Sequence, residues 1–214
     1  IIQAIGLTLG QGSANTVSRL LGEKRRREAN ELFSTAFFTS LFLGFLFAVI
    51  ALISKERFVR FLGATETIAP YAVDYASIIL IGAPWMAVTY TMNNNLRSEG
   101  KAYLGMIGMT SGAVLNVILD PILIFGFKMG IKGAAWATIM SQLVSFIILS
   151  SHFVNKRSNL TLSLSLVRLK WPIYRSIIII GSPSLFRSLM HTVAAIAMNV
   201  YAAPFGDGAI AAMS

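Results

Sequence analysis

Residues 115–142 read LNVILDPILIFGFKMGIKGAAWATIMSQ, two apolar runs separated by a short turn that glycines bound. Asp120 is the only acidic residue that lies well inside any long apolar run of the chain. Asn116 stands four residues earlier, so on a helix both side chains point to the same face. We expect Pro121 to disturb that helix, because proline has no N–H and its ring clashes with an earlier carbonyl. A carboxylate in lipid is costly unless it is paired or used, so this stretch predicts membrane helices and a functional site.

The composition is that of a membrane protein. Of 214 residues, 55% are hydrophobic and only 13% are charged, and the mean hydropathy is +0.69, whereas soluble domains carry roughly a quarter charged residues. The charges lie between apolar runs of about twenty residues, the length that a helix needs to cross a bilayer. We therefore expect an all-α, polytopic helical membrane protein without a soluble domain, with six transmembrane helices at residues 2–21, 32–53, 75–96, 103–125, 131–153 and 173–203.

A change of composition suggests two lobes. The segment 155–172 is polar and basic, and we interpret it as a linker between lobes. Residues 1–154 then form most of a first lobe, and residues 173–214 begin a second one. The chain starts inside an apolar, glycine-spaced run, so we expect an interior fragment of a longer protein.

Two local patterns make finer predictions. Gly6 and Gly10 leave a groove that lets a neighbouring helix approach closely. In the longer connection 54–74, a threonine cap and Pro70 favour a short interfacial helix that starts near Thr65 or Thr67.

The basic residues predict the orientation in the membrane. The formal net charge is +9, and twelve of the 18 lysines and arginines belong to the loops after the first, third and fifth helices. The positive-inside rule places these loops, near residues 22–31, 97–102 and 155–172, in the cytoplasm. Membrane topology explains this charge without nucleic acid. Asp120 then lies near the outer end of its helix, about 8 Å below Phe125 at 1.5 Å rise per residue.

The residues of enzymes are missing from the sequence. The chain has no cysteine, which excludes thiol catalysis and cysteine-ligated metals within it. Its two histidines, His152 and His191, belong to different helices and have no carboxylate at metal-ligand spacing. HExxH, GxSxG and phosphate-loop motifs are absent as well. We therefore expect a protein that is not an enzyme.

Asp120 allows two interpretations. Near a helix end, it could cap the break at Pro121 or reach interfacial water. Alternatively, its carboxylate exchanges a proton or helps to coordinate Na⁺, while Asn116 offers an amide oxygen and Thr138 a hydroxyl from the next helix. Oxygen ligands at a broken helix are how many transporters hold hard cations.

Arg187 and His191 also share a helix face, because they are four residues apart. They could line a substrate pathway. They could instead be satisfied within the bundle, with Arg187 paired to a backbone carbonyl that Pro183 exposes.

Five motifs in order resemble the multidrug and toxic compound extrusion (MATE) transporters. These are Ser18-Arg19-Leu20-Leu21-Gly22 before a basic loop; Leu62-Gly63-Ala64 with Glu66; Leu96-Arg97-Ser98-Glu99-Gly100; Leu115-Asn116-x-x-Leu119-Asp120-Pro121; and Gly130-Ile131-Lys132-Gly133-Ala134-Ala135-Trp136-Ala137-Thr138. The resemblance implies a twelve-helix protein of two lobes, of which our six helices are the second to the seventh.

The resemblance also implies cation-coupled antiport that exports drugs or other cationic and amphipathic compounds across the cytoplasmic membrane. Asn116, Asp120 and Thr138 match the coupling site of the branch that uses its first lobe. That branch's acid on the first helix is not in this sequence. The branch with an acid on the seventh helix is not matched, since no Asp or Glu occurs between residues 173 and 203.

Partners and alternatives follow from this resemblance. We expect H⁺ or Na⁺ as the coupling ion and no other cofactor, with Na⁺ at Asp120 as the one metal. The partners are the lipid bilayer and a small-molecule substrate, without nucleic acid, and the full-length protein is expected to be a monomer. Two alternatives stay open: a lipid-linked saccharide flippase of the same superfamily, at which Arg187 hints, and a membrane scaffold that does not transport.

Overall fold

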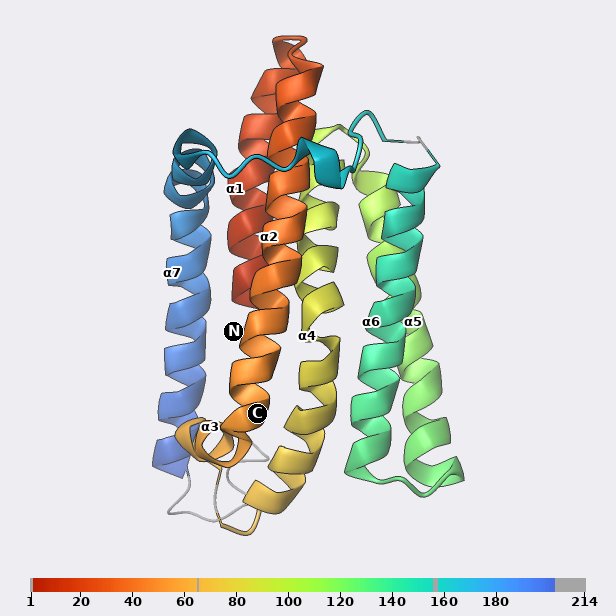
Figure 1. Ribbon diagram of the computed structural model, residues 1–214. Helices are drawn as coiled ribbons and strands as arrows, with labels where there is room; N and C mark the ends of the chain where they lie inside the picture. Colours follow the sequence, from red (N-terminus) through yellow and green to blue (C-terminus); the bar gives the residue numbers. More distant parts are fainter. Residues whose placement is uncertain (1, 65, 156–157, 203–214) are drawn as a thin grey trace.

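The computed structural model describes residues 2–64, 66–155 and 158–202. Within these ranges the fold is all α-helical (Figure 1). The elements, in chain order, are α1 (Ile2–Gly22), α2 (Arg26–Ile53), α3 (Lys55–Phe61), α4 (Ala69–Ser98), α5 (Ala102–Pro121), the π-helical turn η1 (Ile122–Gly126), α6 (Ile131–Val154), the 3-10 turn η2 (Leu164–Leu166) and α7 (Trp171–Ala202).

All six predicted long helices are present, as α1, α2, α4, α5 with η1, α6 and α7. Five of them are long and apolar enough to span a membrane; α1 is not among these five. The reason is its place in the bundle, where α1 packs against α2, α4 and α7. A helix enclosed by protein can carry buried polar residues, such as Ser13 and Thr16, that lipid would not tolerate.

The predicted interfacial helix near Thr65 or Thr67 is wrong in position. The short helix of this connection is α3, Lys55–Phe61, which follows α2 directly after Ser54. Its first turn carries Glu56 and its last turn Arg60, an arrangement that the helix dipole favours. Pro70 instead belongs to the first turn of α4, where its missing N–H costs nothing. Thr65 lies outside the described residues.

Small residues bring α1 close to two neighbours. A Cβ at Gly6 would stand 2.8 Å from the Cβ of Tyr90, and one at Gly10 would stand 3.0 Å from the Cα of Thr91, both on α4. The predicted Gly6–Gly10 groove is therefore confirmed, with α4 as the helix that fills it. On another side of α1, Gly12 lies against the carbonyl of Ile177 on α7. Helix α7 is thereby packed onto α1 along their length.

Successive long helices run in opposite directions, so the loops between them lie alternately at the two ends of the bundle, as predicted. Figure 1 shows the α1–α2 turn, the α4–α5 turn and the segment 158–170 at one end, which we call the basic end. Helix α3 and the α5–α6 connection lie at the other, the α3 end. This arrangement agrees with the predicted grouping of loops, while the side of the membrane that each end faces stays a prediction.

Side chains of the basic end hold the predicted linker in place. The carboxylate of Glu99 is fully buried and accepts hydrogen bonds from the Ser158 hydroxyl at 2.5 Å and from the Asn159 N–H at 2.7 Å. Further along, the Thr161 N–H donates to Asn30 at 3.0 Å and the Arg168 N–H donates to the Thr35 hydroxyl at 3.0 Å. Residues 156–157 of the linker and 203–214 of the predicted second lobe lie outside the described residues, and the lobe boundary stays a prediction.

Candidate functional site

The end of α5 changes its winding directly after Asp120. Pro121 closes the α-helix and residues 122–126 continue as a π-helical turn, in which the Phe127 N–H donates to the Ile122 carbonyl at 2.9 Å. The predicted disturbance at Pro121 is confirmed. Because proline has no N–H, it cannot satisfy the Val117 carbonyl one turn earlier. The break thus leaves a backbone oxygen without its helical donor on the turn between Asn116 and Asp120.

Close packing of α5 on α6 fixes which residues stand at the same height. A Cβ at Gly112 would meet the Ser145 hydroxyl and stand 2.9 Å from the Ser141 carbonyl, and one at Gly133 would stand 2.8 Å from the Leu123 carbonyl. The two helices are antiparallel, so each step down α5 matches a step up α6. Asp120 is therefore level with about residues 136–137, and Asn116 with about residues 140–141. Thr138 lies within about two residues of the height of Asp120, but no hydrogen bond joins the two side chains within the described structure, and the site stays a prediction.

Polar atoms at this height are buried and unsatisfied. Within the described structure, Asp120 Oδ1 and Asn116 Nδ2 have no contact with solvent and no hydrogen-bond partner. Thr138 is partly buried and its hydroxyl donates to the Ala134 carbonyl at 2.9 Å, which leaves the oxygen lone pairs available. A carboxylate oxygen buried without a donor is expensive, and a proton or a cation removes that expense. Within the described structure, the Asp120 side chain makes no hydrogen bond that would cap the helix break.

The same region holds buried polar groups that the sequence interpretation missed. They are the Oε1 atom of Gln142 and the hydroxyl of Ser141 on α6, together with the indole N–H of Trp85 and the hydroxyl of Ser77 on α4. Gln142 follows Thr138 by four residues, the spacing that also relates Asn116 to Asp120. That repeated spacing on the neighbouring helix was the signal that could have identified it.

The donor set decides which ions could bind. Among the described residues, no three His, Cys, Asp or Glu side chains gather as a metal site. A bound ion at Asp120 would therefore rely on one carboxylate and on neutral oxygens. Such oxygen ligands suit a hard cation such as Na⁺ and not a transition metal that prefers imidazole or thiolate.

A large apolar cavity of about 690 Å³ lies toward the α3 end. Ala134, whose carbonyl accepts the Thr138 hydrogen bond, is part of its wall, and Leu80 of α4 is another part. The cavity thus reaches within one helical turn of Thr138. Its polar lining includes Thr192 and Asn199 of α7.

Arg187 and His191 belong to a second cavity, of about 470 Å³, between α1 and α7. Both are exposed and line this cavity with Gln3, so the prediction that they share a face is confirmed. Thr192 lines both cavities, which makes them neighbours. The structure does not bring Arg187 or His191 into the Asp120 group, because they are on α7 and that group is on α5 and α6.

The alternative in which Arg187 pairs with the carbonyl that Pro183 exposes has no hydrogen bond in its favour within the described ranges. Pro183 lies inside α7 and cannot donate to the Ile179 carbonyl four residues earlier. The hydroxyl of Ser182 satisfies that carbonyl at 3.0 Å. No ion pair is formed by Arg187 in the described ranges, so its charge is directed at the cavity.

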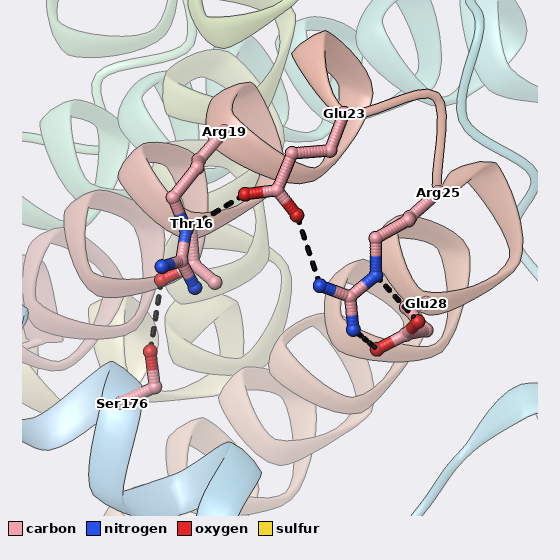
Figure 2. A network of polar contacts seen from close by, with 6 residues as sticks. All are labelled: Thr16, Arg19, Glu23, Arg25, Glu28 and Ser176. Atoms are coloured by element: carbon pink, nitrogen blue, oxygen red, sulfur yellow. Dashed lines mark hydrogen bonds and ion pairs between the residues drawn. The ribbon is translucent and has the colours of Figure 1, made fainter.

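The basic end carries an ion-pair network that is separate from these cavities (Figure 2). Arg25 contacts Glu28 at 2.7 Å and Glu23 at 2.9 Å, and Arg19 approaches Glu23 at 4.0 Å. Hydrogen bonds, first with Glu28 and then with Glu23, raise the pKa of Arg25. These exposed pairs link the end of α1 to the start of α2.

Known proteins resemble this chain along nearly its whole length. The family model MatE matches residues 1–122. The multidrug export protein MepA of Staphylococcus saprophyticus is 31% identical over 99% of the chain, and that of Staphylococcus haemolyticus is 30% identical. A solved structure described as an inward-facing multidrug resistance MATE family transporter of the MOP superfamily superposes with a TM-score of 0.88 at 29% identity, over 94% of this chain and 46% of that one.

The chain spans about half the length of the curated relatives it matches, 47% for each of these two export proteins. These relatives are named as exporters, not enzymes, which agrees with the absence of catalytic motifs. The shared part includes the α5–α6 region and the described part of α7. Since the matching family model covers more than half of the sequence, this chain belongs to the MatE family.

Proposed function

We propose that this chain forms part of a cation-coupled antiporter that exports drugs or other amphipathic and cationic compounds across the cytoplasmic membrane. The observation that carries the proposal is the buried, unpartnered Oδ1 of Asp120 beside a helix break and close to the height of Thr138. Asp120, Asn116 and Thr138 form the coupling site. Multidrug export is what the relatives are named for.

The proposed coupling follows from the free-energy cost of the charged Asp120 carboxylate when no ion is bound to it. A charged carboxylate costs about 2.5–3.5 kcal/mol at the centre of a membrane helix on insertion scales and less toward its ends, so Asp120 without an ion favours a conformation that brings it to water. Binding of H⁺ or Na⁺ removes the net charge and relieves that bias. An ion can shift the conformational balance only by its difference in affinity between the two states. Inward movement of the ion then drives outward movement of the drug.

The two cavities support a substrate with an apolar body. The 690 Å³ cavity is mostly apolar and adjoins the Thr138 turn. The 470 Å³ cavity adds Arg187 and His191 as polar contacts on the proposed substrate pathway.

The flippase alternative has one specific observation in its favour. Arg187 lines a cavity without an acidic neighbour, and a guanidinium pairs readily with phosphate. Binding of a lipid-linked saccharide together with indifference to cationic dyes would favour this alternative. The relatives reported above, named for multidrug export, add no support to it.

The membrane placement is part of the proposal. We place the loops near 22–31, 97–102 and 155–172 in the cytoplasm, the basic end inward, because they carry most of the cations. Asp120 then opens toward the outer side, and the full-length protein acts as a monomer.

Asp120→Asn in the natural full-length protein is the variant that tests the site. We expect export of a cationic dye from cells to fall at least tenfold, because the amide cannot exchange a proton or neutralise an ion. Asp74→Asn is the matched control: Asp74 is a half-exposed acid of α4 paired with Lys132 at 3.2 Å. Normal dye export by Asp120→Asn at equal expression would refute the site.

A further inference from the structure

A groove at the basic end follows the seam between α1 and the start of α7 and extends onto α7 alone, where residues of α7 line its third part. It consists of three adjoining cavities of about 340, 350 and 310 Å³. Ser176 lines all three, and Arg19 lines the first two. The groove therefore runs from the charged loops toward the apolar part of α7.

The charged mouth of this groove is positive. Arg19 and Lys170 line the first cavity and Arg175 lines the third, and all three side chains are exposed. Arg19 has only its 4.0 Å contact with Glu23, and within the described ranges Lys170 and Arg175 form no ion pair. Three cations thus stand at the mouth without full compensation.

The acids of the first cavity are already neutralised. Glu28 is paired with Arg25 at 2.7 Å. Glu31 lies 3.5 Å from Arg27 and 3.4 Å from Arg168. An anionic ligand at the mouth would therefore meet the free cations and no free carboxylate.

The other end of the groove is apolar and lies further from the charged loops, where Ile179 is 59% exposed and Ile180 is half-buried. Ile179 and Ile180 line it about one helical turn beyond Ser176. Trp171, 72% exposed, stands at the mouth, and tryptophan favours the boundary between headgroups and acyl chains. Between the two ends, the hydroxyls of Thr16 and Ser176 bond to each other at 2.9 Å across the seam (Figure 2).

We propose that this groove binds an anionic phospholipid, with its phosphate held by Arg19, Lys170 and Arg175 and an acyl chain along Ile179 and Ile180. Basic pockets between membrane helices bind lipid headgroups in this way, and a guanidinium contacts phosphate with two parallel hydrogen bonds. The lipid touches α1 and α7 at once, so it stabilises the seam between them. The inference requires that the chain lies in a membrane, and it is independent of the coupling ion and of the exported compound.

The experiment uses the natural full-length protein in phosphatidylcholine nanodiscs with a rising fraction of phosphatidylglycerol that carries brominated acyl chains. Bromine quenches the fluorescence of nearby tryptophans. The part of this quenching that Trp171→Phe abolishes comes from Trp171 and reports on lipid in the groove. The test variant is Arg19→Gln with Arg175→Gln. The matched control is Arg57→Gln with Arg60→Gln, two exposed arginines of α3 at the opposite end.

We expect Trp171 to be quenched at a low phosphatidylglycerol fraction in the wild-type protein and in the α3 control. In the test variant, the phosphatidylglycerol fraction that gives half of the Trp171 quenching (the half-quenching fraction) should rise about five-fold for each cation removed. Arg19→Lys with Arg175→Lys keeps both charges and should retain most of the effect, which excludes misfolding as the cause.

Three results would overturn the proposal. One is equal quenching by brominated phosphatidylcholine, which would indicate ordinary lipid contact. Another is an unchanged half-quenching fraction in the glutamine variant. The third is full competition by millimolar inorganic phosphate, which would assign the cations to a soluble anion. None of them bears on dye export through Asp120.

Discussion

At the scale of single residues, the proposed cation site consists of Asn116 and Asp120 on α5 and Thr138 on α6, and Gln142 follows Thr138 by one helical turn. Asn116 and Asp120 repeat at a spacing of four on α5, and Thr138 and Gln142 repeat at the same spacing on α6. The buried atoms Asp120 Oδ1, Asn116 Nδ2 and Gln142 Oε1 make no hydrogen bond within the described structure. Each unsatisfied buried polar atom costs about 1–3 kcal/mol, and such costs are retained where a function requires them.

Thr138→Val removes one proposed ligand oxygen while keeping the shape of the side chain. We expect the stabilisation of the full-length protein by Na⁺, measured as the rise of Tm with salt at constant ionic strength, to require roughly tenfold more Na⁺. Thr89→Val is the matched control, because the Thr89 hydroxyl makes the same kind of bond, to the Trp85 carbonyl at 2.7 Å, and belongs to no proposed site.

An equal loss of Na⁺ sensitivity in Thr89→Val would contradict this assignment. So would an unchanged Na⁺ response in Thr138→Val, if the wild-type protein responds to Na⁺. If the wild-type protein does not respond to Na⁺ and dye export follows pH instead, the coupling ion is H⁺.

At the scale of elements, the hairpin of α5, η1 and α6 holds the site by close backbone contact. Glycines at Gly108, Gly112 and Gly133 let the two helices approach until their side chains and carbonyls touch. These three glycines are therefore packing positions of the α5–α6 pair. The π-helical turn after Pro121 lies against Gly133, so the break beside Asp120 is supported by α6.

Gly112→Ala should therefore destabilise the protein. The new Cβ would meet the Ser145 hydroxyl and the Ser141 carbonyl, and such overpacking costs roughly 1–3 kcal/mol. We expect a lower Tm in detergent, with partial recovery when Ser145→Ala is added. Gly126→Ala is the control, since nothing lies within 4 Å of its added Cβ. Equal Tm values for the two single variants would contradict the packing account.

At the scale of the whole molecule, the segment 158–170 connects the helices up to α6 with α7 and is fastened to the basic end. Glu99, Asn30 and Thr35 accept its backbone N–H groups, and Arg168 reaches Glu31 at 3.4 Å. The buried Glu99 carboxylate makes the strongest of these contacts, because hydrogen bonds to charged groups are worth about 1.5–3 kcal/mol each.

Glu99→Ala should release this segment. We expect hydrogen exchange at residues 158–163 to become at least tenfold faster, while exchange in the centre of α2 stays unchanged. Glu56→Ala, which removes an exposed acid of α3, is the control. If exchange at residues 158–163 is the same in Glu99→Ala and in the wild-type protein, the segment is held by other contacts.

The sequence predicts most of this architecture and only part of the site. Long apolar runs determine the helices, so all six were found. Periodicity on α5 singled out Asn116 and Asp120, because a charged residue in an apolar run is conspicuous. Gln142 and Trp85 were missed, since an amide or an indole is common in such runs. Only the packing of α4 and α6 shows that the Gln142 oxygen and the Trp85 N–H lack a hydrogen-bond partner.

Two further differences have local causes. The bond from Ser182 to the carbonyl exposed by Pro183 depends on the rotamer of a common residue, which sequence spacing does not predict. The short helix α3 begins directly after α2, where the pattern of caps suggested a later start.

The most direct test of the central claim is antiport in proteoliposomes that contain the natural full-length protein. An imposed Na⁺ or H⁺ gradient should drive a cationic dye against its own gradient in the wild-type protein and in Asp74→Asn, and should drive none in Asp120→Asn. Gradient-driven dye movement of equal size in Asp120→Asn would contradict the claim that Asp120 couples the ion to export.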